Sequence, residues 1–79
     1  MRTMNNPRRR KISKLIEQLD ALKAELEEIL EEESEAFDNI PEAFAETDRY
    51  AAAEEALDNL DTAFGGLEEV IDSLTEATN

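Results

Sequence analysis

Cysteine, histidine and tryptophan are absent from this chain of 79 residues. Without cysteine there is no disulfide, no thiolate zinc site and no cysteine nucleophile. Without histidine the commonest general base and the commonest metal ligand of proteins are missing, so Ser13, Ser34 and Ser73 have no base partner. The sequence therefore predicts a protein that is not an enzyme and that has no catalytic residue, no cofactor and no metal site.

Glycine and proline are scarce, with two of each, and aromatic residues make up 5% of the chain. Few residues therefore interrupt regular helix. No apolar run approaches the roughly 20 residues that span a bilayer, and the basic start leads into a charged amphipathic pattern and not into the apolar core of a signal peptide. We expect no membrane contact and a cytoplasmic location.

Charge is abundant and unevenly placed. The formal net charge is -13, from 21 acidic and 8 basic residues, and six of the eight bases lie within residues 1–14. From residue 15 onward only Lys23 and Arg49 oppose the 21 acids. A polyanion of this kind disfavours direct binding to nucleic acid and favours a basic partner.

The first long pattern is an apolar ladder between Ile12 and Ile40 that predicts a helix over about residues 8–39. With Ile12 as heptad position a, the apolar residues fill rows a, d and e. Row a holds Ile12, Leu19, Leu26 and Ile40 and is broken only by Glu33; row d holds Leu15, Leu22, Ile29 and Ala36; row e includes Ile16, Leu30 and Phe37. This arc is wider than the two-row seam of a coiled coil.

A second ladder follows a corner at residues 40–47. Pro41 ends the first helix because it cannot donate to the hydrogen-bond ladder, and Thr47 is a good N-cap for a helix over about residues 48–77. With Tyr50 as position a, apolar residues fill rows a, d and g, and row g holds Ala56, Ala63, Val70 and Ala77. The rows cross Gly65 and Gly66 without a change of phase, so one continuous helix is expected.

These elements predict an all-α fold: a basic flexible tail at residues 1–7 and a long antiparallel helical hairpin at residues 8–78. Because three apolar rows on each helix are too many for one hairpin to cover, we expect two copies to form a four-helix bundle. A hairpin that covers an apolar groove of another protein is the competing use of this surface. The expected oligomer interface comprises Ile16, Leu19, Leu26, Leu30, Leu57, Phe64, Val70 and Ile71.

The carboxylates coat the outside of both predicted helices. One interpretation is a solvated face that keeps the protein soluble. The other is a phosphate mimic, in which carboxylates repeated along rigid helices occupy the basic groove of a nucleic-acid-binding protein. The expected partner contacts are Glu54, Asp58, Asp61, Glu68 and Glu69. A divalent-ion loop or a di-iron bundle is disfavoured because the chain lacks the Asp-rich loop and the histidines that these sites use.

A basic arm, Arg8 to Lys14, begins the first helix. Positive charge at a helix N-terminus is mildly unfavourable and asks for compensation. An antiparallel hairpin places this arm beside the end of the second helix, near Asp72 and Glu76, where intramolecular charge pairing is expected. Contact with nucleic acid or with an anionic membrane surface is the alternative.

Several stretches of the chain carry a resemblance. They are Glu35 to Glu42, which includes the Phe37-Asp38-Asn39-Ile40-Pro41-Glu42 corner, together with Thr47 to Tyr50, Ala56 to Leu60 and Leu67 to Ile71. In this order they resemble a group of small acidic helical proteins of bacteriophages and other mobile elements of bacteria. The resemblance covers nearly all of residues 8–77. It implies a small helical hairpin of phage type and carries over no catalytic residue.

The functional hypothesis is a non-enzymatic acidic binding protein, of phage origin by the resemblance. It inhibits or modulates a nucleic-acid-binding or defence protein of the host through its carboxylates, as a DNA mimic does. The alternative is a structural coiled-coil or oligomerisation module, in which the apolar ladder is the function and the acids only provide solubility.

Overall fold

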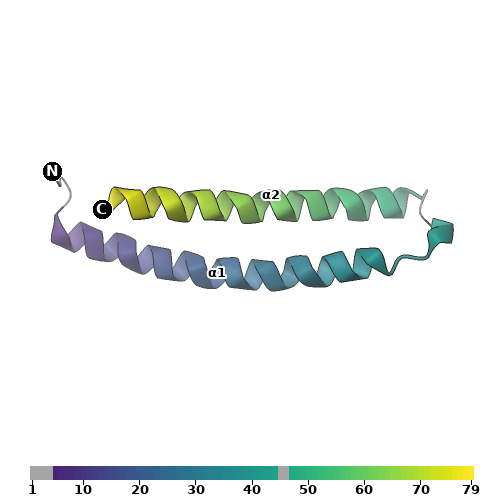
Figure 1. Cartoon of the computed structure of the whole chain (residues 1–79), viewed down its shortest axis with the longest axis horizontal. Coiled ribbons are helices and arrows are strands. Elements are labelled where there is room, and N and C mark those ends of the chain that lie inside the picture. The colour runs from purple at the N-terminus through teal and green to yellow at the C-terminus, as the bar shows by residue number, and fades with distance from the viewer. Residues whose placement is uncertain (1–4, 45–46) are drawn as a thin grey trace.

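Two long helices account for most of the protein. The structure is a computed structural model that describes residues 5–44 and 47–79. In chain order the elements are α1 (Asn6–Asp38), the single 3-10 turn η1 (Glu42–Phe44) and α2 (Asp48–Ala77). Figure 1 shows α1 and α2 side by side along nearly their whole length, with η1 at one end. The expected all-α hairpin is confirmed, and the described residues contain no strand.

The start of α1 lies earlier than the sequence indicated. Asn5 is the N-cap, and its side-chain Oδ1 accepts a hydrogen bond of 3.0 Å from the amide of Arg8. Pro7 stands in the first turn, where its missing N–H leaves no gap in the hydrogen-bond ladder. The helix thus takes in residues assigned above to the flexible tail, whose residues 1–4 lie outside the described part of the chain.

Capping hydrogen bonds end α1 and begin α2 on the two sides of the corner. At the end of α1 the amide of Asn39 donates to the carbonyl oxygens of Glu35, at 3.1 Å, and Ala36, at 3.3 Å. Pro41 follows and cannot extend the helix. On the other side, the hydroxyl of Thr47 accepts a 3.3 Å hydrogen bond from the amide of Tyr50 and so caps α2.

The double glycine does not interrupt α2. The helix runs continuously from Asp48 to Ala77, and neither Gly65 nor Gly66 has a positive φ. The predicted continuity is confirmed. A Cβ atom added at either position would meet nothing within 4 Å, so no contact within the hairpin requires glycine there.

The two helices touch along a thin seam. On α2 the half-buried side chains follow rows a and d, as in Tyr50, Leu57 and Leu60. On α1 they follow rows a and e instead: Ile12, Ile16, Leu19, Lys23, Leu26, Leu30, Phe37 and Ile40. No described residue is fully buried, because one helix covers only one side of the other.

Row d of α1 therefore faces solvent. Leu15, Leu22 and Ile29 are 49%, 54% and 48% exposed. Of the three apolar rows that the sequence places on this helix, rows a and e make the seam, and row d is left out. The expectation that a single hairpin leaves part of its apolar arc uncovered is confirmed.

Candidate protein-binding surfaces

The antiparallel seam divides the rod, whose extents are 60 × 17 × 13 Å, into two long faces. Each residue of a helix is rotated by about 100° about the helix axis relative to the one before it. Measured from the direction of the seam, row b of α1 and row e of α2 are therefore rotated by about 70° to 80° toward the same face. Rows d of α1 and g of α2 lie at similar angles on the opposite face. Each helix contributes one row to each face.

The first face is acidic. We define the carboxylate face by Asp20 and Glu27 of α1 and by Glu54, Asp61 and Glu68 of α2. A shallow hollow supports this grouping, because Ser34 in row b of α1 lines it together with Asp58 and Asp61 of α2. Successive members of each row are about 10 Å apart along the helix.

Three of the five predicted partner contacts share this face. Glu54, Asp61 and Glu68 occupy row e of α2 and are exposed. Asp58 lies at the edge of the face, and Glu69 lies on the side of α2 that is turned away from α1, by the same helical rotation. The structure thus groups three of the predicted residues and separates Glu69 from them.

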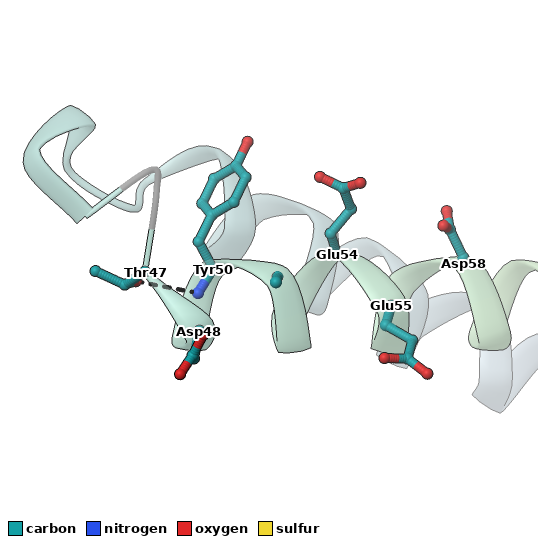
Figure 2. Close-up of a pocket in the computed structure, with 7 residues that line it drawn as sticks. Thr47, Asp48, Tyr50, Glu54, Glu55 and Asp58 are labelled. Atoms are coloured by element: carbon teal, nitrogen blue, oxygen red, sulfur yellow. Dashed lines mark hydrogen bonds between the residues drawn. The ribbon is translucent and has the colours of Figure 1, made fainter.

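Figure 2 shows the start of α2, where a shallow hollow is lined by Tyr50, Glu54, Glu55 and other residues. Glu54 and Asp58 project to one side of the helix, whereas Asp48 and Glu55 project to the other. The carboxylates here do not converge on a point. Across the described residues, no three acidic side chains are grouped so that they could hold a metal ion.

Lys23 is a residue that the sequence reasoning did not single out. Its Nζ lies 3.3 Å from Oε2 of Glu68 and 5.3 Å from the centroid of the Phe64 ring. The pair of Lys23 and Glu68 is the only ion pair in the described part of the chain. The position of Lys23 could have indicated this contact, because Lys23 stands in row e between Ile16 and Leu30. If row e packs in the seam, Lys23 lies in the seam as well.

The second face is apolar. We define the apolar face by Leu15, Leu22, Ile29 and Ala36 of α1 and by Ala56, Ala63, Val70 and Ala77 of α2. Val70 is 47% exposed. A hollow near the corner supports this grouping, because Ala36 from row d of α1 lines it together with Arg49 from row g of α2.

The residues predicted for an oligomer interface fall into two groups. Seven of them are half-buried in the seam of the hairpin itself: Ile16, Leu19, Leu26, Leu30, Leu57, Phe64 and Ile71. Val70 alone lies on the apolar face. Leu15, Leu22 and Ile29 also lie on this face and, unlike the seven seam residues, are about half exposed, although the expected interface does not include them.

The basic arm meets the end of α2, but not through the expected carboxylates. Arg9 is half-buried, and its guanidinium donates to the backbone carbonyl of Thr78. The C-terminal carbonyls of a helix carry partial negative charge, which a guanidinium satisfies. The expected position of the arm beside the end of α2 is thus confirmed, although among the described residues no ion pair joins it to Asp72 or Glu76.

The described helices are amphipathic throughout, and none of them combines the length and the apolar character needed to cross a lipid bilayer. Comparisons of the chain with models of protein families, with curated proteins and with solved structures found no match. What the protein does is therefore inferred from its two faces.

Proposed function

We propose that this chain is a non-enzymatic binding protein that occupies the basic surface of a partner protein, of the kind that otherwise binds nucleic acid. The observation that carries the proposal is the row of Glu54, Asp61 and Glu68 on one face of α2, flanked by Asp20 and Glu27 of α1. Within the described residues, Lys23 at Glu68 is the only cation paired with this face.

A rigid acidic rod suits such a partner for two physical reasons. A formal charge of -13 steers a basic protein toward it and raises the association rate. The carboxylates stand on regular helices, so fewer degrees of freedom are lost on binding than if they stood on a flexible chain. The resulting complex is expected to weaken as salt screens the charges.

The class of partner follows from the resemblance given above. A phage-type acidic hairpin that fills a basic groove competes there with nucleic acid, and this competition inhibits or modulates a nucleic-acid-binding or defence protein of the host. The protein acts in this proposal as a DNA mimic.

A second candidate function has an observation of its own. The apolar face exposes a heptad-spaced row of leucine and isoleucine on α1, and exposed apolar patches of this extent mark interaction sites. In that case the chain is a structural oligomerisation module, and the carboxylates only keep it soluble.

The test is capture from a bacterial lysate cleared of nucleic acid by nuclease. The protein is immobilised, captured proteins are eluted with a salt gradient, and each is then tested for binding to duplex DNA. We expect a captured protein that binds DNA and that releases DNA when this chain is added. The triple variant Glu54→Lys, Asp61→Lys, Glu68→Lys should retain less than about a tenth of the capture, because like charges would then face the basic surface.

A matched control makes the same change of net charge elsewhere. Glu17→Lys, Glu28→Lys and Glu31→Lys lie on the side of α1 that is turned away from α2, by helical rotation. This control should keep most of the capture. If the variant of row e captures the same proteins as the unmodified chain in low and high salt alike, or if captured proteins do not exchange the chain for DNA, the mimic proposal is wrong.

A further inference from the structure

The apolar face leaves the fold incomplete. No described residue is fully buried, and the largest exposed apolar side chains, Leu15, Leu22, Ile29 and Val70, all belong to this one face. A chain of this size usually gains the rest of its core by association, because a thin seam buries too little apolar surface. A second layer of helices on this face would bury both rows.

We infer that the occupant of the apolar face is a second copy of this chain, docked antiparallel, so that α1 lies on α1 of the second copy and α2 on α2. Two identical faces can be stacked with twofold symmetry in two ways. A twofold axis along the rod brings the two corners together and places α1 over α2. An axis across the rod reverses one copy and places like helices over each other.

The charges at the two ends of the rod favour the axis across the rod, which stacks the two copies antiparallel. Residues 8–14 hold five basic side chains and no acid, whereas residues 31–38, near the corner, hold five acids and no base. Parallel stacking would bring these acids of both copies to one end. Antiparallel stacking brings the basic arm of each copy beside the acids of the other.

The rows that border the apolar face agree with this orientation. When the twofold axis passes near Leu22, Leu15 of one copy and Ile29 of the other copy lie at the same position along the rod. Each of them is seven residues from Leu22. Row g of α1 runs along the edge of the contact. There Lys11 lies opposite Glu32 of the second copy, within one residue of the same level.

From Ala52 to Ala77, rows c and g of α2 carry no charge, and Arg49, also in row g, lies at the start of the helix. The apolar row of Ala56, Ala63 and Val70 is bordered by Ala52, Asn59, Gly66 and Ser73, so the two α2 helices meet without a charged side chain between these rows. Gly66 and its small neighbours permit a close approach of two helix backbones, and the open space at Gly66 within one hairpin leaves room for it.

The available area is sufficient for a stable dimer. The two longer extents of the rod, which bound each of its two long faces, are 60 and 17 Å between Cα atoms. The area of one face is on the order of 1,000 Å², which exceeds the roughly 800 Å² that each partner buries in a standard stable interface.

Sedimentation equilibrium at micromolar concentration tests the stoichiometry, with a mass of twice 8.9 kDa expected. Leu22→Lys should raise the dissociation constant at least about a hundredfold, because both copies lose a leucine at the axis. Ala24→Lys adds the same charge on the other side of α1, where Ala24 is exposed, and should leave the constant within about threefold.

Orientation is tested by spin labels and by a charge exchange. The chain has no cysteine, so Ser34→Cys, at an exposed position, provides one label per copy. Antiparallel copies place the two labels more than about 35 Å apart, whereas parallel copies place them within about 25 Å. Lys11→Glu should weaken the dimer about tenfold in low salt, and adding Glu32→Lys to the same chain should restore it.

Each of these measurements either supports or overturns the proposed dimer. A monomeric mass at all concentrations overturns the inference, and so does an unchanged dissociation constant in Leu22→Lys. A dimer with the short label distance overturns the antiparallel orientation, even if Leu22→Lys fails to fold. The dimer uses the face opposite to Glu54, Asp61 and Glu68, so the triple lysine variant should dimerise normally, and failure of the mimic proposal leaves this one untouched.

Discussion

The pairing of Lys23 with Glu68 offers a measurable test of how the seam is built. The Lys23 side chain is 27% exposed and the Glu68 side chain 51% exposed, with Nζ and Oε2 3.3 Å apart. The same ammonium lies 5.3 Å from the centroid of the Phe64 ring. We predict that Lys23→Met and Glu68→Gln are coupled in their effects on the free energy of unfolding.

The size of the coupling follows from the exposure of the pair. Because Glu68 keeps about half of its surface in water, the ion pair belongs with surface pairs, which contribute about 0.2 to 1 kcal/mol. We therefore expect a coupling free energy of about 0.5 kcal/mol. It should fall by more than half in about 1 M NaCl, where the screening length is near 3 Å. A second cycle, Lys23→Met with Phe64→Leu, should give about 0.5 to 1 kcal/mol from the cation–π contact.

The assay is urea unfolding followed by far-ultraviolet circular dichroism, since urea is uncharged and does not screen the pair. All variants are measured at one protein concentration, because association would otherwise change the apparent stability. Glu69→Gln is the control: Glu69 makes no ion pair within the described residues, and its coupling to Lys23 should be near zero. Coupling of Lys23 with Glu68 no larger than this control in low salt would refute the described seam geometry, as would a coupling above about 2 kcal/mol that salt does not reduce.

Three further predictions concern the backbone and the overall charge. Gly65→Ala should raise the free energy of unfolding by up to about 1 kcal/mol, measured by urea unfolding, because the added methyl group meets open space and alanine favours helix; a loss of stability would contradict it. Asn5→Ala and Thr47→Ala should each cost about 1 kcal/mol by removing an N-cap, whereas Asn59→Ala, at an exposed helical position, should cost nothing in the same assay. Raising NaCl from low salt to about 0.5 M should increase the melting temperature, because screening relieves the self-repulsion of a net charge of -13; an unchanged or lower value would mean that attractive pairs outweigh repulsion.

The local features of the fold could be predicted because they depend on short segments. Pro41 ends α1 through its missing N–H, and Thr47 caps α2 through its own side chain. The apolar rows pass Gly65 and Gly66 in phase, and α2 is accordingly continuous. The start of α1 differs from the expected one: the helix begins at Asn6 and not at about residue 8, because Asn5 caps it beside Pro7.

The choice of seam on α1 could not be predicted in the same way. Rows d, a and e form an arc of about 100°, which contains two adjacent pairs of rows, and one partner helix covers only one pair. The relative rotation of the helices decides between them. In this structure the ring of Phe37 in row e packs against that of Tyr50, with centroids 4.8 Å apart and planes inclined by 38°. Lys23 in the same row reaches Phe64 and Glu68.

The amino-acid sequence by itself determined two long helices, their corner and an excess of apolar rows, because helix propensity, capping and periodicity act within a few residues of each other. Only the tertiary structure decided which row is left in solvent and which carboxylates share a face. These properties depend on how one helix is rotated against the other, and that rotation is set by contacts between residues distant in the chain, such as Phe37 with Tyr50.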